Sequence, residues 1–384
     1  MKYDYIIAGS GCAGLSLLYN LLQDSELNKK KILVIDKDIK QKNDRTWCFW
    51  EKEAGIFESI VHREWKTLEF LTTDFEKKFD LEEYSYKMIR GIDFYQFVLD
   101  FTKKFDTVTF CYESISAIDS DSNNGTVITD KATYTGDFVF NSTPIFNPEI
   151  NIKNSLLQHF EGWEIETKEP VFDSKVGTLM DFRVSQKYGT TFMYVLPTSS
   201  TIALVEYTLF TEKLLNKKEY KAELKKYIKE VLKIEDYELV HEEFGVIPMS
   251  LAKFERSPKN KERIVNIGTA GGYTKASSGY TFQFVQKQTK LIMEALKTGK
   301  TPNLNLSFRG KMFEWYDKTV LDVMISEKMT GKEIFSIMFK KLPPDELLAF
   351  LGNESSFWQE FKIMNSVPII PFMTSGMKQL FSKH

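Results

Sequence analysis

Short apolar runs and a helical pattern alternate at the start of the chain. Residues 3–8 (YDYIIA) and residues 31–36 (KILVID) are apolar runs rich in β-branched and aromatic side chains. Between them, the apolar positions of residues 15–22 have helical spacing. Apolar runs of this length are typical of buried parallel strands. The first 36 residues therefore predict a βαβ unit.

The middle of the chain predicts mainly strands. Residues 93–105 return to helical spacing, whereas residues 107–141 consist of short alternating runs that are interrupted by Asn123-Asn124-Gly125. This pattern predicts a β-meander with a return strand at residues 137–141. Residues 168–210 hold several β-rich runs separated by Gly, Pro and Ser, which predicts an inserted antiparallel sheet.

The last part of the chain changes from strands to helices. A charged helix is expected at residues 212–231, and strands at 244–250 and 263–267 lead into a second glycine-rich segment. From residue 312 onward the pattern is helical. Residues 335–341 and 367–373 combine apolar side chains with nearby lysines. Such helices either rest on a membrane surface or pack on the protein's own core, and the pattern alone favours the core.

Charge and composition exclude several classes of protein. The 51 basic and 53 acidic residues nearly cancel, which gives no support for nucleic-acid binding. The three cysteines and four histidines are scattered, so no metal site is expected. No run of about 20 apolar residues and no signal peptide is seen, and a cytoplasmic protein is expected. The 31 phenylalanines fit either a large apolar cavity or a compositional bias.

The first glycine-rich turn has the spacing G-x-G-x-x-G. Gly9 follows the first strand, Gly11 and Gly14 open the helix, and Asp36 ends the second strand. Gly9 permits the tight turn, Gly11 lets a pyrophosphate approach the backbone, and Gly14 lets the helix lie close to the strand. The helix N-terminus attracts the pyrophosphate, and Asp36 can accept a hydrogen bond from a ribose hydroxyl. We therefore expect a dinucleotide here.

A second glycine-rich segment favours FAD over NAD as this dinucleotide. The segment from Gly268 to Gly279 follows an apolar strand and precedes a helix that starts near Phe282, so its amides could hold a flavin phosphate or ring edge. The prediction is an α/β, Rossmann-type two-domain flavoprotein. Residues 1–150 and 245–300 would bind FAD, residues 151–244 would form a substrate domain with the antiparallel sheet, and residues 301–384 would be helical.

An ordered set of motifs resembles the bacterial lycopene cyclase family. The motifs occur in the family's order over about three quarters of the chain. Besides the two glycine-rich segments, they are residues 44–49 (DRTWCF), 157–163 (LQHFEGW), 192–197 (FMYVLP), 205–208 (VEYT) and 245–248 (GVIP).

The resemblance implies a function and a catalytic residue. It implies FAD that is kept reduced by NAD(P)H, and a reaction that cyclises lycopene and other acyclic carotenoids, as a lycopene β-cyclase does, without net oxidation. Peripheral contact with the inner face of the cell membrane would suit such a substrate. Glu206 matches the first acid of the family's acidic motif, but Tyr207 stands where a second acid commonly follows. The resemblance thus leaves Glu206 as the single candidate acid.

The chemistry of cyclisation supports Glu206 independently. Protonation of an alkene needs a strong acid in a dry site, and burial keeps a carboxyl group protonated at neutral pH. The developing carbocation needs nearby negative charge or aromatic rings. The alternative for Glu206 is a solvent-facing acid on an edge strand. Arg45 either approaches the flavin or lies on the surface, while Asp181 and Arg183 either act in the site or pair with each other.

Other functions on the same fold stay open. A flavin-dependent reductase of isoprenoids or carotenoids, a hydroxylase, and a carotenoid or flavin carrier are the alternatives. The late segment lacks the Gly-Asp-Ala-His pattern typical of hydroxylases, because Thr269 replaces the acid. Aromatic residues such as Trp47, Phe49, Trp50, Trp163 and Tyr280 either line a polyene tunnel or belong to the core.

Overall fold

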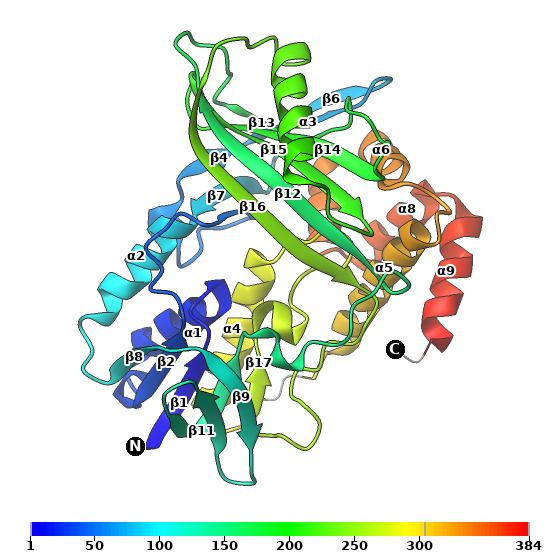
Figure 1. The fold of residues 1–384 in the computed structure, drawn as a ribbon. Helices are drawn as coiled ribbons and strands as arrows, with labels where there is room; N and C mark the ends of the chain where they lie inside the picture. Colours follow the sequence, from blue (N-terminus) through cyan, green and yellow to red (C-terminus); the bar gives the residue numbers. More distant parts are fainter. Residues whose placement is uncertain (1, 303–304, 383–384) are drawn as a thin grey trace.

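The computed structural model describes residues 2–302 and 305–382. Residues 303–304 and 383–384 of the expected helical region, and residue 1, lie outside the described part. The described chain forms three sheets and a group of C-terminal helices, and Figure 1 shows the larger two sheets at opposite ends of the molecule.

The first sheet contains the expected βαβ unit. Its strands follow the order β8-β2-β1-β11-β10-β9, and β17 also pairs with β11. β1, β2, β8, β11 and β17 pair in parallel, and β9 and β10 add an antiparallel meander to β11. The strands are β1 (Lys2–Ala8), β2 (Ile32–Asp36), β8 (Val108–Tyr112), β9 (Ile115–Ser120), β10 (Gly125–Thr129), β11 (Thr133–Asn141) and β17 (Ile264–Asn266).

Three helices cover one face of this sheet. They are α1 (Cys12–Gln23), α2 (Gly91–Thr102) and α4 (Phe282–Lys297), and α1 begins three residues before the expected position. Strand alternation places Ile7 and Val34 in the core with these helices, whereas Ile6 and Leu33 pack in a separate core that includes Val127. Each such fully buried aliphatic side chain stabilises the fold by about 1.5–3 kcal/mol.

The second sheet is larger than the sequence indicated. Its order is β16-β12-β15-β14-β13-β5-β6, and every neighbouring pair except β13 and β5 is antiparallel. β5 and β6 come from within residues 1–150, the segment expected to bind FAD. The strands are β5 (Thr67–Leu71), β6 (Glu76–Asp80), β12 (Ser155–Glu166), β13 (Val176–Asp181), β14 (Thr190–Pro197), β15 (Ile202–Thr211) and β16 (Glu238–Ser250).

Helices cover both faces of the second sheet. On one face, Val205 and Tyr207 pack against Leu224 of α3 (Lys217–Glu230). On the other face, Leu204 and Phe210 belong to the core that the C-terminal helices complete. Successive residues of β15 therefore alternate between two different cores.

A small third sheet connects the two large ones. β7 (Ser85–Arg90) is its central strand, and β3 (Thr46–Glu51) and β4 (Arg63–Trp65) pair with it antiparallel. Arg45 therefore lies immediately before the first residue of β3, next to the first sheet's glycine-rich turn.

In the described part of the chain, five helices form the C-terminal region, which the sequence predicted to be helical. They are α5 (Phe308–Ile325), α6 (Gly331–Lys341), α7 (Pro344–Leu351), α8 (Phe357–Ser366) and α9 (Ile369–Phe381). The two apolar segments of this tail behave differently, because Phe335, Met338 and Phe339 of α6 are buried in the core whereas several apolar residues of α9 are exposed. Among the described residues, no helix is both long and apolar enough to cross a membrane.

Candidate active site

One large cavity joins the two glycine-rich segments to the second sheet. Its volume is about 710 Å³. The site residues that the sequence indicated all line this cavity, with the exception of Gly14. Those that line it are Gly9, Gly11, Asp36, Arg45, Glu206, Gly268 and Gly279. The cavity therefore brings the expected dinucleotide site and the expected acid into one space.

The first glycine-rich turn has the geometry of a dinucleotide cradle. Gly9 has φ 102°, a left-handed conformation that favours glycine. A Cβ atom on Gly14 would lie 2.0 Å from the carbonyl oxygen of Gly9, so α1 can lie this close to the turn only because residue 14 is glycine. A Cβ atom on Gly11 would meet no atom within 4 Å, because Gly11 faces the cavity at the start of α1. The helix N-terminus is thus open to an anionic group.

Asp36 is held ionised at the end of β2. Its carboxylate accepts hydrogen bonds from the Ser10 amide (2.7 Å), the Ser10 hydroxyl (2.9 Å) and the Asp38 amide (2.9 Å). Burial opposes ionisation, but these hydrogen bonds and nearby Lys40 hold the pKa of Asp36 below its ordinary value. An ionised carboxylate in this position suits a ribose hydroxyl as its hydrogen-bond donor.

The late segment lies against the N-terminus of α1. A Cβ atom on Gly268, which has φ 60°, would lie 2.7 Å from Cβ of Ala13. The amide of Gly268 already donates a hydrogen bond to Oε1 of Gln288 (2.8 Å). It is therefore not free to donate to a flavin phosphate, as the sequence suggested. At Gly279, with φ 74°, a Cβ atom would lie 1.8 Å from Oε1 of Gln158. Both glycines therefore permit close approaches that shape the cavity wall.

Glu206 lies on a central strand rather than at a sheet edge. β15 is hydrogen-bonded to β12 on one side and β14 on the other, and the carboxyl of Glu206 accepts a hydrogen bond from the Thr208 hydroxyl (2.7 Å). The side chain is surrounded by protein and accessible only in part, from the cavity that it lines. Burial, together with the charge of Glu243, raises the pKa of Glu206 to about 8.

A second carboxyl group, Glu243, accompanies Glu206. In β12, Gly162 is the register partner of both Glu206 in β15 and Glu243 in β16. A Cβ atom on Gly162 would lie 3.2 Å from Cγ of Glu243 and 3.5 Å from Oε2 of Glu206, so the two acids flank one glycine on the same face. Glu243 is not among the site residues expected from the sequence, because no spacing along the chain reveals that β16 pairs with β12.

Glu243 is buried with one oxygen unsatisfied. Oε2 accepts a hydrogen bond from the Thr46 hydroxyl (2.8 Å), whereas Oε1 has no hydrogen-bond partner among the described residues. Burial raises the pKa of Glu243 to about 7, which is less than for Glu206 because Thr46 and the Arg45 charge stabilise its ionised form. The pair can therefore hold one proton near neutral pH, with Glu206 as the carboxyl that keeps it.

Tyrosines form the cavity wall beside Glu206. The hydroxyl of Tyr280 lies 3.5 Å from that of Tyr86 and 3.4 Å from that of Tyr194. All three are in the cavity lining, as is Trp47. The faces of such rings can attract a cation.

The other aromatic candidates lie in the core, and the other charged candidates pair with each other. Trp163 packs between the second sheet and α3, and Phe49 stacks on Phe282 at 4.5 Å. Trp50 packs with the C-terminal helices and edge-on against Tyr280 at 4.5 Å. Asp181 and Arg183 form an ion pair with each other at 2.7 Å. No cluster of metal-ligating side chains occurs in residues 2–302 or 305–382.

Solved flavoprotein structures share this fold at low sequence identity. A geranylgeranyl bacteriochlorophyll reductase-like protein from Thermoplasma acidophilum has a TM-score of 0.62 and 12% identity, over 98% of this chain and 99% of that one. A flavoprotein/dehydrogenase from Cytophaga hutchinsonii has a TM-score of 0.63 and 13% identity, over 99% of both chains. Halogenase PltM, in complex with phloroglucinol and FAD, has a TM-score of 0.53 and 12% identity, over 90% of this chain and 78% of that one. The fold is therefore the mixed α/β fold of FAD-binding flavoproteins.

Sequence comparison identifies the family. No curated protein sequence gives a significant match to the chain. The family model described as "Lycopene cyclase protein" matches residues 4–377, which is nearly the whole chain and includes every site residue named above. The chain therefore belongs to the lycopene cyclase protein family.

Proposed function

We propose that this protein is an FAD-dependent lycopene β-cyclase, which converts the acyclic ends of lycopene to β-ionone rings, giving γ-carotene and then β-carotene, without net redox change. The observation that carries the proposal is the carboxyl group of Glu206 in the wall of a cavity that also reaches the dinucleotide cradle, with the buried carboxyl group of Glu243 beside it across Gly162. Acid–base chemistry on a hydrocarbon requires such a protonated acid and a nearby base.

We infer that FAD occupies the part of the cavity near the first sheet. The open N-terminus of α1 at Gly11 would face the pyrophosphate, Asp36 would accept a ribose hydroxyl, and Arg45 lies where its charge would favour a phosphate or an anionic ring. When bound and reduced by NAD(P)H, FAD would supply negative charge near a developing cation. Residues 1–150 and 245–300 would provide this FAD-binding part, residues 151–244 most of the substrate part, and residues 301–384 a helical cover.

The two acids divide the proton chemistry between them. Glu206, with the higher pKa, donates its carboxyl proton to a terminal alkene carbon of the substrate. The resulting tertiary carbocation is attacked by the neighbouring double bond, which closes the ring. Glu243, with the lower pKa, accepts the proton that the ring carbon loses when the new double bond forms. A proton transfer from Glu243 to Glu206 restores both groups, so no proton is consumed.

The remaining residues exclude water and stabilise charge. Leu204, Leu196 and Phe160 contribute apolar surface to the cavity, where a hydrocarbon replaces water at a favourable free energy. The rings of Tyr86, Tyr194 and Tyr280 can attract the carbocation through their faces. Thr46 and Thr208 hold the two carboxyl groups in position.

The test is turnover of lycopene by the purified protein under anaerobic conditions with FAD and NAD(P)H. We expect cyclic products of the same mass as lycopene, and a loss of at least about 100-fold in rate for Glu206→Gln, since general acid catalysis contributes about 10²–10⁴. The matched control is Glu242→Gln, which removes an adjacent, exposed carboxylate that pairs with Lys221, and should retain full activity.

The products also separate the alternatives. A product two hydrogens heavier, formed with one NAD(P)H per turnover, would indicate a reductase, as the name of the Thermoplasma acidophilum protein suggests for that protein. A product heavier by one oxygen would indicate a hydroxylase, and unchanged lycopene would indicate a carrier. Any of these results contradicts the cyclase proposal.

A further inference from the structure

The last two helices of the described chain turn their apolar sides outward. In α8, Phe357, Trp358 and Phe361 are exposed, with Trp358 at 78%, whereas the buried residues are Glu360, Ile363 and Ser366. Globular proteins normally bury the apolar side of a helix and expose the polar side. Apart from the buried Ile363, α8 does the reverse.

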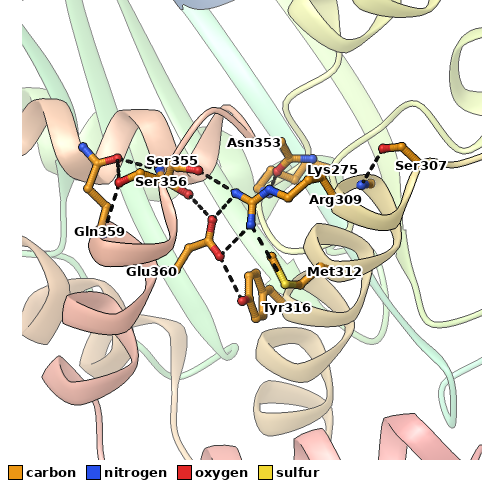
Figure 2. A network of polar contacts seen from close by, with 11 residues as sticks. Lys275, Ser307, Arg309, Met312, Tyr316, Asn353, Ser355, Ser356, Gln359 and Glu360 are labelled. Atoms are coloured by element: carbon orange, nitrogen blue, oxygen red, sulfur yellow. Dashed lines mark hydrogen bonds and ion pairs between the residues drawn. The ribbon is translucent and has the colours of Figure 1, made fainter.

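An ion pair with a buried carboxylate fixes this orientation of α8. Arg309 of α5 binds the carboxylate of Glu360 and donates to the Ser355 carbonyl (2.6 Å), and the Tyr316 hydroxyl donates to Glu360 (3.0 Å). Figure 2 shows these groups converging between α5 and the start of α8. Because Glu360 points inward to this network, the aromatic residues on the other side of α8 are held in solvent.

α9 has the same inverted arrangement. Its buried residues are Ser375, Gly376 and Gln379, and Gln379 donates to Asp322 of α5 (3.1 Å). Its exposed large side chains recur at positions i, i+1, i+4, i+8, i+11 and i+12, which lie on one side of a helix. They are Ile369, Ile370, Met373, Met377, Leu380 and Phe381, and Phe381 is 81% exposed.

The charges around these apolar sides are mainly positive. Glu360 is the single acidic residue of α8 and α9, and it is buried. Lys362 and Lys378 belong to the two helices, Lys341 binds the Ser366 carbonyl (2.6 Å), and Lys328 binds the Ser375 hydroxyl (2.8 Å). The acids Asp322 and Glu346 form ion pairs with three of these four lysines, and the lysines exceed the two acids by two charges.

We propose that the exposed sides of α8 and α9 form a docking surface for a lipid bilayer with anionic headgroups. Exposed aromatic and aliphatic side chains with a lysine rim have the composition of helices that lie in the membrane interface. A second copy of the chain fits less well, because a symmetric dimer would bring the same lysine-rimmed surface against itself. This proposal is independent of the proposed catalytic function.

The experiment is co-sedimentation of the full chain with vesicles of phosphatidylcholine alone and with added phosphatidylglycerol. We expect stronger binding to the anionic vesicles, weakened several-fold by raised salt. Trp358→Ser with Phe361→Ser, and separately Ile370→Ser with Phe381→Ser, should each weaken binding by about tenfold or more, because each pair removes two large apolar side chains from the interface.

The matched control is Leu239→Ser with Val240→Ser, which removes two exposed apolar side chains from β16. This variant should bind vesicles as the unchanged protein does, and the circular dichroism of all variants should show that the fold is kept. Equal vesicle binding by all variants would overturn the proposal. The proposal would also be overturned if light scattering showed that the protein forms a dimer without lipid and that the α8 or α9 substitutions dissociate this dimer.

Discussion

Gly162 lets two acidic side chains occupy the same face of the second sheet. Glu206 and Glu243 are its register partners on either side, and a Cβ atom at residue 162 would come within 3.2 Å of Glu243. Two neighbouring carboxyl groups with little access to water cannot both ionise cheaply, so their pKa values separate. This separation creates an acid and a base from identical side chains.

The pH dependence of turnover should report this pair. Activity should fall as the pH rises through about 8, because Glu206 then loses the proton it must donate. In Glu243→Gln the neighbouring negative charge is absent, so the pKa of Glu206 should be lower and the alkaline fall should begin at a lower pH. The rate of this variant should also drop by about 10–100-fold if Glu243 accepts a proton.

The free energy of unfolding should also depend on the titration of Glu206 and Glu243. Both folded-state pKa values lie above the ordinary value of 4.5, so the folded state holds more protons than the unfolded state between about pH 4.5 and 8. The free energy of unfolding should therefore decrease as pH rises through this window, by about 1–3 kcal/mol, since the cavity admits some water to Glu206. An activity profile whose alkaline limb is the same with and without Glu243 would refute the coupling.

At the scale of elements, two glycines of the turn between β1 and α1 have different surroundings. Gly14 is enclosed, whereas Gly11 opens onto the cavity. The same substitution at these two glycines should therefore have different results.

Gly14→Ala should destabilise the protein by about 1–3 kcal/mol or more, because the added methyl group overlaps the Gly9 carbonyl and forces α1 away from the turn.

Gly11→Ala should leave the thermal unfolding of the FAD-free protein nearly unchanged, yet weaken FAD binding by at least about tenfold, because its methyl group enters the space expected for the pyrophosphate. Calorimetric unfolding and flavin titration measure the two effects. Equal FAD affinity for Gly11→Ala and the unchanged protein would place the dinucleotide elsewhere.

At the scale of the whole molecule, the C-terminal helices complete the core of the second sheet. α6 buries Phe335 and Phe339 against it, and α8 is joined to α5 through the Arg309–Glu360 pair. Removal of one partner of a buried ion pair leaves the other charge unpaired. The position of α8 against α5 should consequently depend on this contact.

Glu360→Ala should lower the free energy of unfolding by about 2–4 kcal/mol, a little less than for a fully buried pair because Arg309 is partly exposed. Hydrogen exchange should increase most in α8, whose start the pair anchors. The control is Glu294→Ala, which removes an exposed glutamate from α4 and should change stability by less than about 0.5 kcal/mol. A loss of stability no larger than that of the control would show that the pair does not hold α8 in place.

Local sequence determined the parts of this protein that depend on neighbouring residues. The βαβ unit, the glycine fingerprint with Asp36, the meander and the helical tail follow from periodicity and from backbone demands that only glycine meets. The motif order also identified the family, and the family match to residues 4–377 confirms it.

Only the tertiary structure decided which distant strands meet. It placed β5 and β6 in the second sheet, Glu206 on a central strand and Glu243 beside it. It also buried α6 while leaving the apolar sides of α8 and α9 exposed. The physical reason is that strand register and helix packing are set by burial summed over the whole chain, so a residue's partners across strands leave no mark in its local sequence.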